Sequence, residues 1–218
     1  MHSNALLVRD VMTRRVAAVP TDAGFKEIIE TMSAWGASAL PVVGADRVVV
    51  GVVSEADLLA KEEFSVSRPT LTQQRCRPRD LAKATGTTAE GLMSSPAVTV
   101  PAMASLPQAA RLMARENVKR LPVVDSAGRL EGIVSRSDLL KVYLRPDEDL
   151  AADVQQDILG RVPKGAGDEL RVRVTGGVVT FTGVMADPRL VPALSRMARA
   201  VPGVVDVVWD LDRADGSA

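Results

Sequence analysis

Two stretches of the chain carry apolar residues at the i, i+3, i+4, i+7 spacing of a helix with one buried face. The first set is Phe25, Ile28, Ile29 and Met32, and the second is Leu106, Ala109, Ala110 and Met113. Thr21 and Ser105 precede these stretches, and hydroxyl side chains are favoured at the start of a helix. The pattern predicts two helices, one opened by Thr21 and the other by Ser105.

Short runs rich in valine and leucine follow each predicted helix. The runs are residues 40–43 and 48–53 around a polar turn at 44–46, and residues 121–124 and 130–134 around a polar turn at 125–128. Such runs indicate strands. A second helix is then expected to begin at Ser54 and at Ser135. Each stretch is therefore predicted to form a helix, strand, strand, helix unit of the α+β class, and two such units can bury their apolar faces on each other.

The two units are copies of one repeat. Leu-Pro-Val-Val at 40–43 returns at 121–124, and Asp57-Leu58-Leu59 returns as Asp138-Leu139-Leu140, both at an offset of 81. The match continues without a gap from about residue 11 to residue 60. Self-similarity at a fixed offset is typical of tandem repeat architectures.

The same glycine-to-aspartate motif closes the match in both copies. It reads Gly51-Val52-Val53-Ser54-Glu55-Ala56-Asp57 and Gly132-Ile133-Val134-Ser135-Arg136-Ser137-Asp138. Layout and motif resemble the CBS repeat. The resemblance implies a pair with pseudo-twofold symmetry (a Bateman module), with repeat 1 at 7–63, an insert at 64–87 and repeat 2 at 88–145. It further implies an adenine nucleotide (AMP, ADP or ATP) as regulatory ligand and a homodimer formed through the CBS repeats.

The motif residues suit a nucleotide. Glycine allows close approach of a ligand to the backbone, and a serine hydroxyl with free N–H groups at a helix start suits an anion. An aspartate one turn later can accept hydrogen bonds from two ribose hydroxyls, so loss of Asp138 is expected to weaken binding about tenfold to a hundredfold. Helix capping alone also explains Ser-x-x-Asp. The competing interpretation is therefore a scaffold that dimerises with empty clefts.

The second copy is the more basic one. Lys119, Arg120 and Arg136 stand where the first copy has Ser38, Ala39 and Glu55. Thr99 stands where the first copy has Ala18, at a position that contacts the nucleoside in CBS proteins. We therefore expect at most one cleft per chain, with Asp138 and Arg136, to bind a phosphorylated nucleotide well. The full expected set is Gly51, Ser54, Asp57, Thr99, Lys119, Arg120, Gly132, Ser135, Arg136 and Asp138.

The insert and the C-terminal part have patterns of their own. Arg75, Arg77 and Arg79 form a basic cluster that we interpret as a solvated face or a dimer contact, and residues 80–83 are expected to form a short helix. Downstream, helix 147–159, strands 170–174 and 178–184 around Gly176-Gly177, helix 190–201 and strand 205–211 are expected. The order of this part is αββαβ. Val205, Val207, Trp209 and Leu211 share one face of the last strand, with Trp209 in the core.

The C-terminal part resembles a BON domain over 147–213. The resemblance is carried by Gly-Val-Val-Thr-Phe-Thr-Gly at 177–183 and Val-Pro-Gly-Val-Val-Asp-Val at 201–207. It implies phospholipid binding. However, eight basic and twelve acidic residues from 146 onward give a net charge of −4, which disfavours an anionic membrane. We expect this domain to contact a protein partner instead.

Composition narrows the function classes. Among the 218 residues, 27 basic side chains balance 27 acidic ones and only 3% are aromatic, so nothing favours nucleic acid. Cys76 is the single cysteine and His2 the single histidine, which argues against disulfides, a multi-cysteine or histidine metal site and a histidine-based triad. The first residues contain no long apolar run and no small-residue cleavage site, so we expect no secretory signal. We expect a cytoplasmic, non-catalytic sensor without a cofactor.

Overall fold

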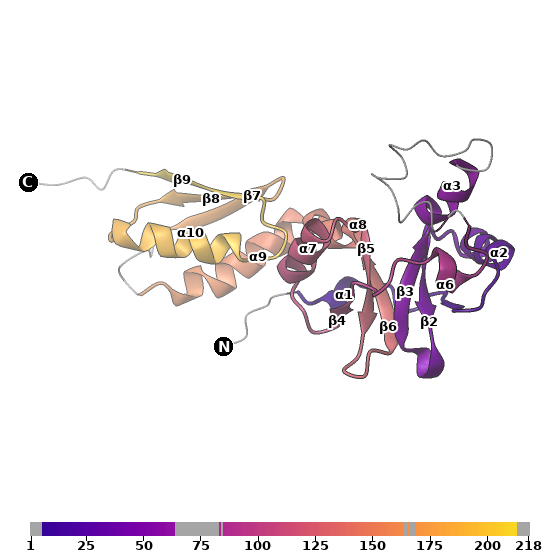
Figure 1. Cartoon of the computed structure of the whole chain (residues 1–218). Helices are drawn as coiled ribbons and strands as arrows, with labels where there is room; N and C mark the ends of the chain where they lie inside the picture. Colours follow the sequence, from indigo (N-terminus) through magenta and orange to yellow (C-terminus); the bar gives the residue numbers. More distant parts are fainter. Residues whose placement is uncertain (1–5, 64–82, 84, 164, 166–168, 213–218) are drawn as a thin grey trace, which may run out of the picture. The chain divides into compact units, whose positions relative to one another are not determined.

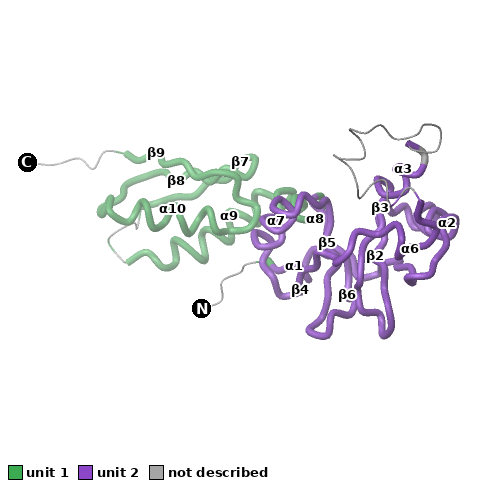
Figure 2. The backbone as a smooth tube through the Cα atoms, in the orientation of Figure 1, with its two compact units in different colours: residues 1–6, 137–218 green, residues 7–136 purple. Residues whose placement is uncertain are grey.

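The computed structural model describes residues 6–63, 83, 85–163, 165 and 169–212, without the side chain of residue 62. The chain divides into two compact units, Leu7–Arg136 and Met1–Leu6 with Ser137–Ala218 (Figure 2). His2, Cys76, the basic cluster of Arg75, Arg77 and Arg79, and most of the helix expected at 80–83 lie outside the described residues.

The first repeat contains β1 (Val19–Pro20), α2 (Phe25–Trp35), β2 (Ala39–Val43), β3 (Val49–Ser54) and α3 (Glu55–Glu63), with a 3-10 turn η1 (Ala45–Arg47) between β2 and β3. Its sheet has the order β1-β2-β3, in which β1 is parallel and β3 antiparallel to β2. Leu40 pairs with Val53 and Val42 with Gly51. This register places the motif on the edge strand of a three-stranded sheet (Figure 1).

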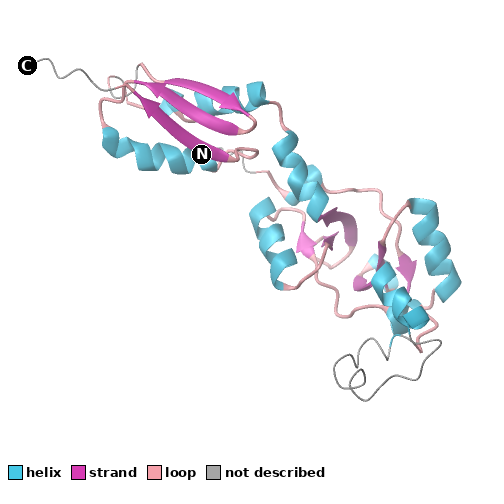
Figure 3. Cartoon of the chain, turned by 90° about the horizontal axis from the view of Figure 1, so that it is seen from above, coloured by secondary structure: helices cyan, strands magenta, loops and turns pink. Residues whose placement is uncertain are grey.

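The second repeat has the same element order, with β4 (Val100–Pro101), α7 (Leu106–Arg115), β5 (Arg120–Val124), β6 (Leu130–Ser135) and α8 (Arg136–Leu140). Leu121 pairs with Val134 and Val123 with Gly132, at the positions equivalent to the first sheet. A 3-10 turn, η2 (Lys141–Leu144), follows α8. The expected helix, strand, strand, helix unit is therefore present twice (Figure 3).

The helix starts differ in detail from the expectation. Helix α2 begins at Phe25 and not after Thr21, because residues 20–23 form a turn in which the Ala23 amide donates to the Pro20 carbonyl at 3.2 Å. Ser105 does cap α7, and its Oγ accepts from the Gln108 amide at 3.4 Å. Ser54 and Ser135 still pair within their sheets, so α3 and α8 begin one residue later than expected.

The buried stripes are narrower than the four-residue pattern indicated. Ile28 and Met32 in α2, like Ala109 and Met113 in α7, are buried. In contrast, Ile29 is 43% exposed and Ala110 is exposed. Since the two exposed residues are equivalent, each repeat leaves the same part of its helix uncovered within the chain.

The N-terminal arm of each repeat packs on the other repeat. In the first arm, which holds α1 (Val8–Val11), the Val8 amide donates to the Ala104 carbonyl and the Thr13 amide to the Ile133 carbonyl, both at 2.9 Å. In the second arm, α6 (Ala89–Leu92) joins the core of the first repeat, and the Ser94 amide donates to the Val52 carbonyl at 2.8 Å. Each motif strand is therefore completed by the other repeat.

The C-terminal unit contains α9 (Asp147–Asp157), β7 (Arg171–Thr175), β8 (Val178–Gly183), α10 (Val191–Arg199) and β9 (Asp206–Leu211), with short 3-10 turns η3 (Leu159–Arg161) and η4 (Pro188–Leu190). Strand β8 is central, antiparallel to β7 and parallel to β9. Both helices lie on one face of the sheet (Figure 1). The order is αββαβ, as expected.

Aromatic stacking and a capped hairpin organise this unit. Trp209 stacks on the buried Phe181 with ring centroids 4.4 Å apart, and its Nε1 donates to Ser195 Oγ at 2.8 Å. The Asp147 carboxylate accepts from the amides of Gly176 and Gly177, whose positive φ angles of 56° and 75° form the turn. Trp209 therefore packs against the core, as expected.

Several element ends in this unit differ from the expected ones: β7 begins at Arg171, β8 ends at Gly183 and α10 spans Val191–Arg199. The expected place of Val205 on the inner face of the last strand is wrong, because Val205 precedes β9 and its side chain is 59% exposed. Its amide donates to the Gly177 carbonyl at 2.8 Å. Leu159 was expected in the first helix, but α9 ends at Asp157 and Leu159 begins η3. Among the described residues, no helix combines the length and the apolar character needed to cross a membrane.

Candidate functional site

The first motif forms a compact hydrogen-bonded corner between strand and helix. Ser54 is the last residue of β3, and Asp57 lies in the first turn of α3. Asp57 Oδ2 accepts from the Ser54 amide at 2.8 Å and from Ser54 Oγ at 2.6 Å. The carboxylate thus satisfies an amide at the start of the helix, as in a capping box. Capping is therefore one real role of this motif.

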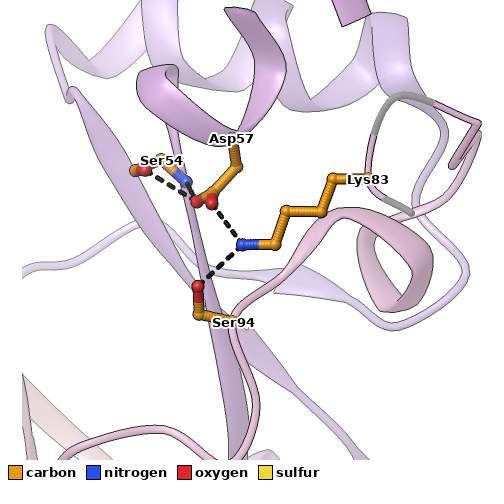
Figure 4. A network of polar contacts seen from close by, with 4 residues as sticks. All are labelled: Ser54, Asp57, Lys83 and Ser94. Carbon is orange, nitrogen blue, oxygen red and sulfur yellow. Dashed lines mark hydrogen bonds and ion pairs between the residues drawn. The ribbon is translucent and has the colours of Figure 1, made fainter. Parts of the chain in front are cut away.

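A lysine from outside the repeat completes the corner (Figure 4). Lys83 Nζ donates to Asp57 Oδ1 and, at 2.8 Å, to Ser94 Oγ. The lysine and aspartate side chains are only 13% and 14% exposed. The first motif thus holds a nearly buried ion pair that links a residue of the insert, the motif helix and the arm of the second repeat.

Sequence reasoning did not identify Lys83 or Ser94. Ser94 could have been found from the sequence, because the offset of 81 relates it to Thr13. In the structure, each of these two residues forms a backbone bridge to the motif strand of the other repeat. Lys83 had no such signal. It lies outside the repeated segment, 26 residues after Asp57, so neither periodicity nor self-comparison relates the two.

The second motif has a different lysine partner. Ser135 ends β6 and Asp138 lies in the first turn of α8, where it is 8% exposed. Asp138 Oδ1 accepts from Lys141 Nζ at 2.8 Å, and this lysine, three residues later, is 63% exposed. The position equivalent to Lys141 in the first repeat is Ala60, which is buried. The two motif aspartates therefore have different environments.

The basic residues expected beside Asp138 are placed by several contacts. Arg136 donates from its amide to the Lys119 carbonyl at 3.0 Å and from Nε to the Val118 carbonyl at 3.2 Å, so Arg136 and Lys119 lie together and both are exposed. Arg120, in contrast, donates from Nη2 to Ser38 Oγ in the first repeat at 2.5 Å. Arg120 therefore joins the starts of β2 and β5 instead of standing at one motif.

Thr99 lies on the connection that leads from the first motif strand to the second sheet. Ser94 is bridged to Val52 in β3, and Val100 begins β4, which pairs with β5. Thr99 is partly buried between these two points. Because the arms are exchanged, a residue counted in the second repeat by sequence can follow directly on a contact with the first motif strand.

The motif glycines provide close packing between the repeats. A Cβ atom at Gly51 would lie 2.3 Å from Met93 Sδ, and one at Gly132 would lie 2.8 Å from the Thr13 carbonyl oxygen and 2.9 Å from Met12 Sδ. The close approach that the glycines permit is therefore to the exchanged arm, whereas the sequence pattern suggested an approach to ligand.

An open cavity of about 570 Å³ lies beside the first arm. It is lined by Arg9, Met12, Arg14, Ala102, Met103 and Glu131. It contains no residue of either motif, so it does not correspond to the expected ribose site. Among the described residues, no group of three or more histidine, cysteine, aspartate or glutamate side chains could hold a metal ion.

Comparison with known proteins identifies a family for each part of the chain. The family model of the CBS domain matches residues 8–63 and 89–145, and that of the BON domain matches residues 146–213. An uncharacterised protein of Methanocaldococcus jannaschii is 27% identical over 160 residues, which cover 66% of this chain and 95% of the relative. The crystal structure of CBSX2 in complex with AMP is 31% identical with a TM-score of 0.55, and the match covers 63% of this chain and 96% of that one.

One likeness extends to an enzyme but covers little of it. The inosine-5'-monophosphate dehydrogenase of Halalkalibacterium halodurans is 26% identical over 143 residues, which are 66% of this chain and only 25% of the enzyme. The match therefore does not extend over most of the enzyme. With the family models covering both repeats and the C-terminal unit, the chain belongs to the CBS-domain proteins and carries two CBS domains followed by one BON domain.

Proposed function

We propose that this protein is a non-catalytic sensor that binds an adenine nucleotide at its second motif, where Asp138 accepts hydrogen bonds from the ribose hydroxyls. The observation that carries the proposal is the difference between the two lysine partners. Asp57 is paired with the nearly buried Lys83, whereas Asp138 is paired with Lys141, whose side chain is 63% exposed. The complex of the related CBSX2 with AMP supports an adenine nucleotide as the ligand class.

The energetics favour ligand exchange at the second motif. An ion pair with an exposed lysine contributes about 0–1 kcal/mol because solvent screens it and the long side chain must be ordered. Hydrogen bonds to a carboxylate contribute about 1.5–3 kcal/mol each, and a ribose offers two hydroxyl donors to Asp138. A nucleotide can therefore displace the Lys141 ammonium at small cost, without leaving the nearly buried carboxylate unpaired.

The basic pair near the second motif suits the phosphate. Arg136 and Lys119 are exposed and joined through their backbone bond. A guanidinium group can bind two phosphate oxygens at once, and a lysine adds a second positive charge. We assign the phosphate to these two residues, whereas Arg120 serves the contact between the repeats.

Assembly follows from the apolar side chains that the chain leaves uncovered. Leu59 in α3 and its equivalent Leu140 in α8 are 64% and 61% exposed. Large apolar residues exposed at equivalent positions favour a symmetric contact between copies. The protein is proposed to form a homodimer through its CBS repeats and to pass the nucleotide state to a protein partner through the BON domain.

The nucleotide proposal is tested by isothermal titration of the purified protein with AMP, ADP and ATP. One site per chain is expected, Asp138→Asn should weaken it about tenfold to a hundredfold, and Asp57→Asn should leave it unchanged. Wild-type affinity in Asp138→Asn would count against the second motif. Absence of any thermal shift with all three nucleotides at millimolar concentration would favour the scaffold interpretation, since a ligand at 100 times its Kd stabilises the folded state by about 2.7 kcal/mol.

A further inference from the structure

We infer that Lys83 is a built-in occupant of the first cleft, which holds the Asp57 carboxylate in an ion pair and closes this motif to nucleotide until the lysine is displaced. The inference rests on the proposed function, because it takes the same ribose chemistry at the second motif as its reference. It adds a cause for the unequal occupancy of the two motifs, and this cause lies in a residue of the insert and not in either repeat.

The hydrogen bonds at Asp57 leave no easy place for a sugar. Oδ2 already accepts two hydrogen bonds from Ser54, and Oδ1 accepts from the Lys83 ammonium. A ribose diol would have to take the same oxygen that the lysine holds. Because Lys83 and Asp57 are both nearly buried, solvent screens this pair much less than an exposed one.

Lys83 is also held from the backbone side. The Lys83 carbonyl accepts from the Gly86 amide at 2.9 Å, and the Gly86 carbonyl accepts from Lys61 Nζ of α3 at 3.0 Å. The Phe25 amide at the start of α2 donates to the Thr87 carbonyl at 3.0 Å. Hydrogen bonds thus connect residues 86 and 87 to α3 and α2 of the first repeat. These bonds position the Lys83 backbone so that its ammonium group can reach the Asp57 carboxylate.

Space at this turn is tight as well. A Cβ atom at Gly86 would lie 2.8 Å from the Gly91 carbonyl oxygen, which belongs to the helix α6 that packs in the core of the first repeat. The same arm supplies Ser94, the second acceptor for the Lys83 ammonium. Lys83 is therefore set between the motif helix and the exchanged arm, so displacing it would break a contact that joins the two repeats.

If Lys83 occupies the first motif, a nucleotide can bind there only in the fraction of molecules from which the lysine is displaced. The apparent Kd of the nucleotide equals the intrinsic Kd divided by this fraction. If the lysine occupies the cleft in about 99% of molecules, the apparent Kd of a ligand that needs the open cleft rises about 100-fold. Any partner contact that pulls the residues around Lys83 away would raise the affinity by the same factor, which makes the first cleft a candidate for control.

The experiment is titration with AMP of four full-length variants in parallel, namely wild type, Lys83→Met, Asp138→Asn and Asp138→Asn with Lys83→Met. We expect one site in wild type, two in Lys83→Met, none of comparable affinity in Asp138→Asn and one in the double variant. Adding Asp57→Asn to the double variant should remove that site again. Lys26→Met serves as the matched control, because it removes an exposed lysine of α2 and should leave one site.

Each outcome separates the inference from the proposed function. Two sites in wild type, or no site in a folded double variant while wild type binds one, would overturn the role of Lys83 and leave the second motif standing. No site in wild type together with one in the double variant would overturn the proposed function and support the lysine as occupant. If Lys83→Met does not fold, Lys83→Ala and Gly86→Ala, which loosens the anchoring turn, provide the same comparison.

Discussion

Arg120 of the second repeat donates a hydrogen bond from Nη2 to Ser38 Oγ of the first repeat at 2.5 Å. The offset of 81 makes Ser38 the counterpart of Lys119 and Arg120 the counterpart of Ala39. The pseudo-twofold symmetry therefore produces no second copy of this contact, because the equivalent positions carry Lys119 and Ala39. Such a pair can hold the repeats together without belonging to either motif.

Arg120→Ala should lower the free energy of unfolding by about 1 kcal/mol, because the partly buried hydroxyl loses a charge-assisted donor. Urea unfolding of Arg120→Ala, Ser38→Ala and the double variant measures the coupling. The effects of the single changes should not add. Strict additivity would show that the bond contributes nothing to the contact between the repeats, while AMP affinity is expected to change less than in Asp138→Asn.

Substitution of either motif glycine by alanine should lower the free energy of unfolding. Gly51→Ala and Gly132→Ala force Cβ atoms against Met93 and against Met12 with the Thr13 carbonyl, so each should destabilise by about 1–3 kcal/mol. Gly132→Ala should be the worse of the two, because a backbone oxygen yields less readily than a methionine side chain. Thermal unfolding measures the effects.

The control for this comparison is Gly24→Ala, where a Cβ atom meets nothing within 4 Å. It should change the free energy of unfolding by less than about 1 kcal/mol. If Met93→Ala restores the stability of Gly51→Ala, the packing explanation is confirmed. Equal stability of Gly132→Ala and Gly24→Ala would contradict it.

The C-terminal unit contains a carboxylate whose titration should be displaced. Arg189 holds the pKa of Asp187 below its ordinary value of 3.8, first through its side-chain hydrogen bond and then through its backbone amide. A lowered folded-state pKa stabilises the folded form above the unfolded-state pKa, and this stabilisation is lost as the pH falls through the folded-state pKa. The contribution is therefore confined to pH values near and above 4.

Carboxyl NMR titration of wild type and Arg189→Ala measures this shift. The Asp187 midpoint should lie below 3.8 in wild type and move upward in the variant, although the backbone donor remains. Asp206, which is lowered mainly by the Val207 amide and then by Arg199, is an internal reference and should not respond to Arg189→Ala. An unchanged Asp187 midpoint in the variant would rule out the side-chain cause.

The homodimer is expected to depend on the exposed leucines of the motif helices. Leu59→Asp and Leu140→Asp place a charge on apolar positions that are 64% and 61% exposed, so they should weaken association with little effect on the fold of the single chain. Light scattering after size exclusion gives the mass. Val208→Asp on the BON sheet is the matched control, and a dimer that survives both leucine changes would place the contact elsewhere.

The BON domain is expected not to bind anionic vesicles. The net charge of −4 from residue 146 onward opposes a negative surface, even though Arg171 and Arg173 are exposed on β7. Co-sedimentation with phosphatidylserine vesicles at low salt should leave the protein in the supernatant. Binding that disappears in Arg171→Glu with Arg173→Glu would replace the proposed protein contact with a lipid contact.

The order of elements could be predicted because local sequence encodes it. The valine-rich runs, the Gly176-Gly177 turn and the Ser105 cap each depend on residues close together in the chain, and the repeat offset showed which units are equivalent. The errors were local too. Thr21 was preferred over Phe25 as the place where the helix begins, although Pro20 and Ala23 form a turn there.

The sequence by itself thus determined the two repeats, the BON domain and the positions of Asp57 and Asp138 in the repeats. Periodicity and self-similarity are properties of the order of residues along the chain, so they can be recognised without coordinates. Only the tertiary structure decided which arm completes which motif strand, what the motif glycines pack against and that Lys83 reaches Asp57. These contacts join residues far apart in the chain, and their partners are selected by packing and by the need to neutralise a nearly buried charge.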